Sequence, residues 1–144
     1  MSETFDLLFR NATLVDGSGA PAVVGDLAVR GERIAAVGRF DGGARRTIDA
    51  SGLVLCPGFI DMHSHADLTL LDYPLAPNLV LQGITTVLGG HCGMSLAPTP
   101  ECASAVHQQL RAPVTWRTFQ DWLQEVERTG IGLNYAPLVG HNTI

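Results

Sequence analysis

The chain has 144 residues, of which 46% are hydrophobic and 16% charged, so it can bury a core and is not disordered by composition. Nine basic and fourteen acidic residues give a formal net charge of −5, and no basic cluster is longer than Arg45-Arg46, which argues against a nucleic-acid partner. The apolar runs fall far short of the roughly 18 residues that a membrane span requires. Acidic residues stand in the N-terminal segment where a signal peptide requires basic ones, so we expect a cytoplasmic protein without a membrane partner.

Short strands and tight turns are predicted for the first part of the chain. Hydrophobic runs bounded by turn-forming residues predict strands over residues 5–9, 13–15, 26–30, 33–37, 47–49 and 53–55. Gly31-Glu32 fits the two-residue loop of a hairpin between two of these strands. Strands this short require a second layer on which to pack.

From Pro57 onward the pattern changes to an alternation of strands and helices. Strands are expected over residues 59–62, 84–88 and 133–139, and helices over residues 75–82, 101–110 and 119–129. Thr118 and Asp121 form a capping-box pattern before the last helix, and Gly130 suits its C-terminal end. This alternation predicts parallel βα units, but a (β/α)8 barrel requires eight of them and about 250 residues. We therefore expect the N-terminal piece of a longer protein, inactive and poorly folded by itself.

Two histidines directly follow the strand predicted over residues 59–62. In a strand, residues i and i+2 face the same side, so His63 and His65 project together while Ser64 points away. Neutral imidazole is a common metal ligand, and two on one face suit a divalent cation such as zinc. The alternative is a pair of surface histidines in a loop. The buried strand before the pair favours the metal site, because active sites of barrels lie at the C-terminal ends of their strands.

Cys92 follows the next predicted strand, within Gly89-Gly90-His91-Cys92-Gly93. The glycines permit unusual backbone angles and a close approach, which would place the thiol beside the histidine pair. A thiolate is a strong zinc ligand, whereas most free cysteines are buried and inert. A nucleophilic role is a third possibility. It is weakened because His91, as the adjacent residue, is expected to point to the opposite face.

The other histidines and cysteines, and the aspartate near the histidine pair, can also be interpreted as residues without a role in metal binding. Asp67, two residues after the histidine pair, is a candidate for orienting a ligating imidazole, or else an ordinary loop acid. His141 follows the third predicted strand and is interpreted as structural or as a support for the ligands. His107 has polar neighbours and is expected to face solvent. Cys56 and Cys102 lack a partner pattern and are expected to pack inside the protein.

Several stretches of the chain resemble the amidohydrolase superfamily. Residues 5–17 resemble the opening of its enzymes, and residues 57–67 resemble the metal motif of its first barrel strand. Residues 83–98, with the Cys-Gly-Met-Ser-Leu-Ala-Pro stretch that begins at Cys92, resemble more specifically the D-aminoacylase branch, the N-acyl-D-amino-acid deacylases. The resemblance extends over essentially the whole chain. His91 departs from it, since the family usually has asparagine there, and this bears on substrate preference because the residue could line the pocket.

The resemblance implies a fold, a metal and an activity. Residues 1–56 would supply strands of a small β-sandwich, and residues 57–144 the first three βα units of a metal-dependent (β/α)8 TIM barrel. His63, His65 and Cys92 would be ligands of Zn²⁺, with Asp67, His91 and His141 around them. The enzyme would hydrolyse the amide bond of a small N-acyl-D-amino acid, releasing the D-amino acid and a carboxylate. Two more histidines and the aspartate that serves as general base would lie beyond this chain.

Two other hypotheses remain open from the sequence. Cyclic-amide and dipeptide hydrolases of the same superfamily share the histidine pair, although many of them bridge two metals with a modified lysine. A non-catalytic metal-binding fragment is the alternative from a different class, since further ligands are missing from this chain. The preferred side chain and the oligomeric state are left open.

Overall fold

The computed structural model describes residues 4–99, 107–111 and 113–144. The chain divides into two compact units, Met1–Pro57 and Gly58–Ile144. The first is an all-β unit, and the second combines a parallel sheet with short helices. Among the described residues, no helix is long and apolar enough to cross a membrane.

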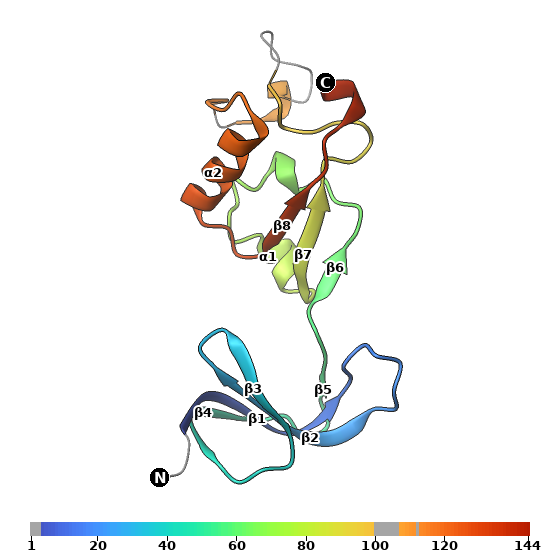
Figure 1. The fold of residues 1–144 in the computed structure, drawn as a ribbon, viewed down its shortest axis with the longest axis vertical. Helices are drawn as coiled ribbons and strands as arrows, with labels where there is room; N and C mark the ends of the chain where they lie inside the picture. Colours follow the sequence, from blue (N-terminus) through green and yellow to red (C-terminus); the bar gives the residue numbers. More distant parts are fainter. Residues whose placement is uncertain (1–3, 100–106, 112) are drawn as a thin grey trace. The chain divides into compact units, whose positions relative to one another are not determined.

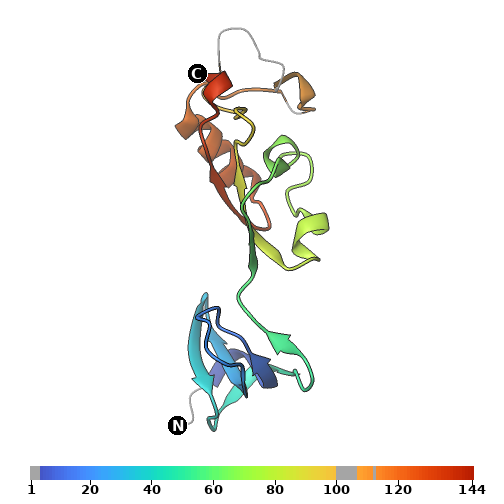
Figure 2. The same cartoon turned by 90° about the vertical axis from the view of Figure 1, so that its right-hand side faces the viewer.

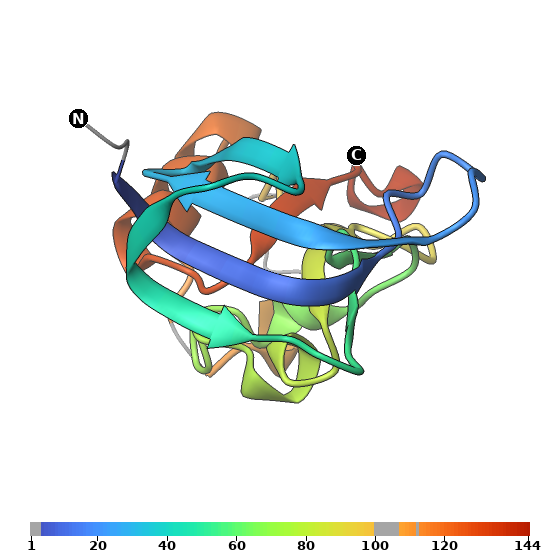
Figure 3. The same cartoon turned by 90° about the horizontal axis from the view of Figure 1, so that it is seen from below.

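The N-terminal unit is a five-stranded sheet with the order β3-β2-β1-β4, in which β5 also pairs with β1. Its strands are β1 (Thr4–Leu14), β2 (Val23–Arg30), β3 (Arg33–Gly38), β4 (Gly43–Asp49) and β5 (Val54–Leu55). Figure 3 shows β1 to β4 side by side. β1 to β3 form antiparallel pairs, with the expected hairpin between β2 and β3, whereas β4 and β5 run parallel to β1.

One irregularity joins the two strands predicted over residues 5–9 and 13–15 into the single strand β1. The register with β2 shifts between Phe9 and Ala12, and Asn11 adopts a left-handed φ of 61°. The N–H of Asn11 donates to Asp26 Oδ1 at 2.9 Å, and Arg10 Nη1 donates to Asp26 Oδ2 at 2.6 Å. The break in the hydrophobic alternation therefore marks a β-bulge inside a strand.

The C-terminal unit has a three-stranded parallel sheet with the order β6-β7-β8 (Figure 1). Its elements are β6 (Phe59–Asp61), η1 (Ala66–Leu68), α1 (Pro77–Val80), β7 (Ile84–Gly89), η2 (His107–Gln109), α2 (Phe119–Thr129), β8 (Asn134–Pro137) and η3 (His141–Thr143). The parallel pairing predicted from the alternation of strands and helices is observed. It brings the C-terminal ends of the three strands to the same edge of this sheet.

Helix α2 packs beside β8, as Figures 1 and 2 both show. The predicted capping box is present, because Thr118 accepts from the N–H of Asp121 while the Asp121 carboxylate accepts from the N–H of Thr118. Trp122, fully buried, donates from Nε1 to the hydroxyl of Tyr135 on β8 at 3.3 Å. The helix ends at Gly130, which has a φ of 73°.

Some local expectations need correction. Helix α1 is shorter than the predicted residues 75–82, because Ala76 takes a left-handed φ of 41° just before Pro77. His107 is buried, not solvated, and a ring nitrogen lies 3.0 Å from the carbonyl oxygen of Leu96. Cys56 is exposed, not packed inside the protein. Cys102 and most of the helix predicted over residues 101–110 lie outside the described residues.

Candidate metal centre

The segment after β6 places two imidazoles on one side of the chain. The N–H of Ser64 donates to the carbonyl oxygen of Leu88 on β7 at 3.1 Å, so the segment continues alongside the neighbouring strand. Ser64 is buried, and its hydroxyl accepts from the N–H of Ala66 at 3.2 Å. His63 and His65 are exposed. The alternation of a strand thus separates the two imidazoles from the buried serine between them.

The second contribution to the site comes from a tight turn after β7. Gly90 and Gly93 have φ values of 79° and 74°, and Cys92 between them has a φ of 57°. A left-handed conformation costs a residue with a Cβ roughly 1–2 kcal/mol, so it persists only where its surroundings enforce it. The turn is also tied to the segment after β6, because the N–H of Gly90 donates to Asp67 Oδ2 at 3.1 Å.

The turn brings the thiol between the two imidazoles. Cys92 Sγ lies 3.5 Å from His63 Nε2 and 3.5 Å from His65 Nε2. One donor atom from each of the three residues lies within 4.8 Å of the other two. All three side chains are exposed. The cysteine is 29 and 27 residues away in the sequence from the two histidines. The sequence-predicted candidates His63, His65 and Cys92 are therefore neighbours in space.

The spacing of these atoms can be compared with that of a zinc site. Zinc–nitrogen and zinc–sulfur bonds are about 2.0 and 2.3 Å long, and tetrahedral coordination then separates nitrogen from sulfur by about 3.5 Å. Both observed nitrogen–sulfur distances are 3.5 Å. Two imidazoles and one thiolate also form a donor set that suits zinc. The residues present fit this ion in chemistry and in spacing.

Asp67 is the buried acid of this region, with 3% of its surface exposed. Burial raises the pKa of its carboxyl group, and the hydrogen bond from the N–H of Gly90 and the neighbouring His65 partly offset that rise. Its Oδ1 is buried and has no hydrogen-bond partner among the residues that the structure describes. Burial and the charge of Asp67 also raise the pKa of Tyr135 above its usual value. The carboxylate accepts from the N–H of Gly90 and so supports the turn that carries Cys92. The two interpretations of Asp67 from the sequence, a residue that orients an imidazole or an ordinary loop acid, both remain predictions.

The other two predicted histidines lie in different surroundings. The ring of His91 stacks on that of His63, with centroids 4.3 Å apart and an interplanar angle of 17°. The Nε2 of His91 is buried, and within the described part of the chain it has no hydrogen-bond partner. His141 is exposed in η3 and is not a member of the three-residue cluster. Sequence reasoning missed the stacking because strand alternation does not extend into a turn with positive φ values.

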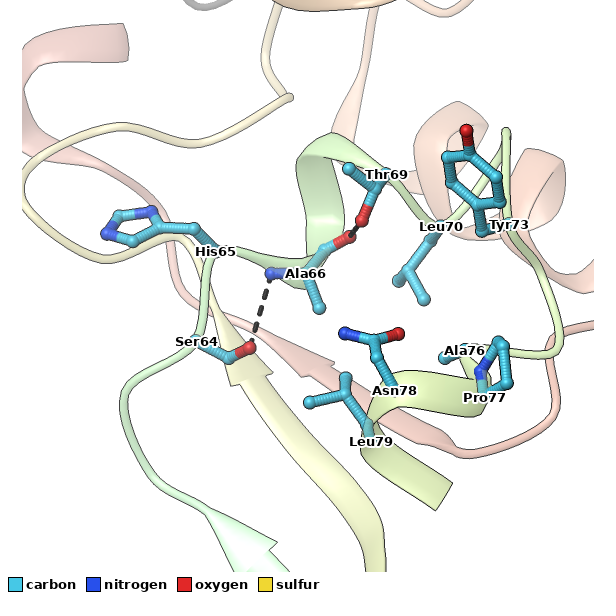
Figure 4. Close-up of a pocket in the computed structure, with 10 residues that line it drawn as sticks. All are labelled: Ser64, His65, Ala66, Thr69, Leu70, Tyr73, Ala76, Pro77, Asn78 and Leu79. Carbon is cyan, nitrogen blue, oxygen red and sulfur yellow. Dashed lines mark hydrogen bonds between the residues drawn. The ribbon is translucent and has the colours of Figure 1, made fainter. Parts of the chain in front are cut away.

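A hollow of about 510 Å³ lies next to the histidine segment (Figure 4). It is lined by Ser64, His65, Ala66, Thr69, Leu70, Tyr73, Ala76, Pro77, Asn78 and Leu79. Figure 4 shows the imidazole of His65 directed away from the other residues that line the hollow. His65 thus borders the hollow, but its imidazole does not point toward the residues on the other side of it.

Comparison with known proteins gives consistent matches along the chain. Residues 46–130 match the model of the family described as "Amidohydrolase family". An N-acyl-D-aspartate deacylase of Alcaligenes xylosoxydans xylosoxydans is 47% identical over 143 residues, which cover 96% of this chain and 29% of the relative. A D-aminoacylase of the same organism is 41% identical, over 99% of this chain and 30% of the relative.

Solved structures agree with the sequence matches. The N-acyl-D-glutamate deacylase of Bordetella bronchiseptica, crystallised with zinc and a phosphonate inhibitor, superposes with a TM-score of 0.88 at 37% identity, over 98% of this chain and 30% of that one. A D-aminoacylase structure gives a TM-score of 0.85 at 40% identity, over 96% of this chain and 30% of that one. The chain thus spans about 30% of the length of these relatives. Because the family match extends over more than half of its residues, the chain belongs to the amidohydrolase family.

Proposed function

We propose that His63, His65 and Cys92 bind zinc and that the protein is a deacylase of N-acyl-D-amino acids. The observation that carries the proposal is the position of the Cys92 thiol, 3.5 Å from a ring nitrogen of each histidine. The same donor set could hold one ion or help to hold two. A (β/α)8 barrel with a small β-sandwich, and a cytoplasmic location, are part of this proposal as predictions from the sequence.

Within this reaction, the residues of the chain have binding and positioning roles. A zinc ion in such a site polarises the carbonyl of the scissile amide and lowers the pKa of its water. His63 and His65 supply neutral ring nitrogens, and Cys92 supplies a negative charge that offsets part of the charge of the ion. The stacked ring of His91 restricts rotation of the His63 imidazole. Asp67 anchors the cysteine turn through Gly90. The general base is expected beyond residue 144.

The substrate class follows from the relatives. The matches at 37–47% identity over nearly the whole chain are named as deacylases of N-acyl-D-aspartate and N-acyl-D-glutamate and as D-aminoacylase. An allantoinase of Escherichia coli, which would represent the cyclic-amide alternative, is 45% identical over 62 residues and 43% of this chain. The longer matches favour a linear N-acyl-D-amino acid as substrate.

The test is hydrolysis by the full-length protein, loaded with zinc, of N-acetyl-D-aspartate, N-acetyl-D-glutamate and N-acetyl-D-leucine. Their L-enantiomers and allantoin serve as comparison substrates. We expect release of the D-amino acid and little turnover of the L-compounds. Turnover of allantoin alone would support the cyclic-amide alternative and contradict the proposal.

The metal ligands are tested separately by zinc content. His63→Ala and His65→Ala should each lower bound zinc and abolish most of the activity. Because both side chains are exposed, the unfolding temperature of the metal-free protein should change little. Leu81→Ala is the control, since this exposed side chain of the same unit is outside the cluster. Full zinc content and activity in the His63 and His65 variants would show that the pair does not bind the ion.

A further inference from the structure

Ser95 lies three residues after Cys92 and is almost completely buried, with 2% of its surface exposed. Its Oγ accepts from the N–H of Gly140 at 2.9 Å and donates to the carbonyl oxygen of Ala97 at 2.6 Å. Gly140 belongs to the segment after β8, some 45 residues further along the chain. A single hydroxyl therefore connects the loop after β7 with the loop after β8.

The backbone of Ser95 makes a second connection to the same segment. Its N–H donates to Thr143 Oγ1 at 2.9 Å, and Thr143 Oγ1 lies within hydrogen-bond distance of the Ser95 carbonyl oxygen at 3.3 Å. Thr143 is itself buried, with 8% of its surface exposed. We call Ser95, Gly140 and Thr143 the serine clasp. Within it, every polar atom of Ser95 has a partner.

Close backbone packing accompanies the serine clasp. A Cβ added to Gly140 would lie 2.6 Å from the carbonyl oxygen of Gly93 and 2.6 Å from the nitrogen of Ser95. The N–H of Asn142 donates to that same carbonyl of Gly93 at 2.8 Å. Gly93 directly follows Cys92, so the segment after β8 contacts the turn immediately beside the thiol.

The turn that contains Cys92 is held by hydrogen bonds on both sides. A residue with a Cβ keeps a positive φ only when the structure around it overrides the local preference. Here, the turn is fixed on one side by the bond between Gly90 and Asp67, and on the other by the bonds of Ser95. Without the hydroxyl of Ser95, the N–H of Gly140 would lose its partner in the interior, which favours separation of the two loops.

We propose that Ser95 is a positioning residue, which keeps the Cys92 thiol between His63 and His65 by joining the loops after β7 and β8. This inference rests on the proposed function, in which Cys92 is a metal ligand. Ser95 acts through the backbone and does not itself contact the metal or the reacting atoms. Supporting groups of this kind commonly change metal affinity by about 10- to 100-fold when they are removed.

The experiment uses the full-length protein reconstituted with Co²⁺, a spectroscopic substitute for Zn²⁺. A thiolate ligand gives Co²⁺ a near-ultraviolet charge-transfer band, which reports directly on the bond to Cys92. Ser95→Ala should weaken Co²⁺ binding by at least about tenfold and reduce this band in the loaded protein. Thr143→Val removes the other hydroxyl at nearly constant shape and should also weaken Co²⁺ binding and reduce the band. Thr143→Ser keeps a hydroxyl and should retain the band.

A matched control separates positioning from general loss of stability. Leu133→Ala removes buried atoms just before β8, in a different hydrophobic cluster of the same unit from the one that contains Leu96 and Ala97. It should lower the unfolding temperature without changing the Co²⁺ spectrum or affinity. If the unmodified protein shows the band and Ser95→Ala binds Co²⁺ with the same affinity and the same band, the positioning role of Ser95 is overturned, while the ligand role of Cys92 stands. If Ser95→Ala does not fold, equal spectra for Thr143→Val and Thr143→Ser would overturn it. Absence of the band in the unmodified protein would overturn the ligand role of Cys92 and this inference together.

Discussion

Gly90→Ala should disturb the candidate metal site more than Gly130→Ala, although the two glycines have similar φ values. Gly90 has a φ of 79°, and a Cβ built on it would lie 2.1 Å from the carbonyl oxygen of Leu138. The left-handed backbone costs alanine roughly 1–2 kcal/mol. Relief of the overlap requires a backbone shift, and overpacking of this kind costs roughly a further 1–3 kcal/mol. The expected loss of unfolding free energy is therefore roughly 2–5 kcal/mol.

Gly130→Ala separates the two contributions. Gly130 has a similar φ of 73°, but apart from its own chain neighbours no described residue has an atom within 4 Å of a Cβ built there. Only the conformational cost of roughly 1–2 kcal/mol therefore applies. Denaturant unfolding of the full-length protein measures both variants, and metal analysis measures their zinc content. Gly90→Ala should also lose zinc, because Cys92 is two residues away, whereas Gly130→Ala should keep it. Equal destabilisation with full zinc content in both variants would refute this reasoning.

Two further predictions concern the thiols and the N-terminal sheet. Cys92 should be protected from alkylation while zinc is bound and become reactive after chelation, whereas the exposed Cys56 should react in both states. Mass spectrometry of the labelled peptides measures the reaction of each thiol. Rapid labelling of Cys92 in the zinc-loaded protein would contradict its ligand role. The hydrogen bond from the Asn11 N–H, with Arg10 nearby, lowers the pKa of Asp26 in the folded chain. The ionised Asp26 carboxylate therefore stabilises the fold above its unfolded-state pKa of about 4, and this stabilisation is lost as the pH falls through the lower folded-state pKa. Asp26→Asn should destabilise the protein at neutral pH and make its unfolding less dependent on acid. An unchanged pH profile in Asp26→Asn would count against that assignment.

Local signals account for the parts of the fold that the sequence predicted correctly. The capping box of Thr118 and Asp121 and the stop at Gly130 depend on residues within a few positions of each other. The proximity of His63, His65 and Cys92 was predictable for a similar reason. Strand alternation determines which side chains project together, and parallel pairing brings the ends of β6 and β7 to one edge.

Contacts distant in sequence account for what was not predicted. His107 has polar neighbours in the chain, yet it is buried, and the carbonyl oxygen of Leu96 within hydrogen-bond distance of a ring nitrogen offsets the cost of that burial. The buried position of Ser95 depends on partners 45 and 48 residues away, and no local pattern marks them. The stacking of His91 on His63 follows from the positive φ values of the turn, which residue types alone do not specify.

The three candidate ligands follow two different strands, β6 and β7, so a bound ion would also affect the stability of the parallel sheet. An ion held by His63, His65 and Cys92 would act as a cross-link between the segments that follow β6 and β7. It would close a loop of 27–29 residues that contains α1 and β7. In the chain-entropy description used for disulfides, closing a loop of that size restricts the unfolded chain by roughly 3–4 kcal/mol. The same ion would then serve the reaction and also secure the first strand pair of the parallel sheet. Chelation should accordingly lower the unfolding temperature of this unit as well as remove activity.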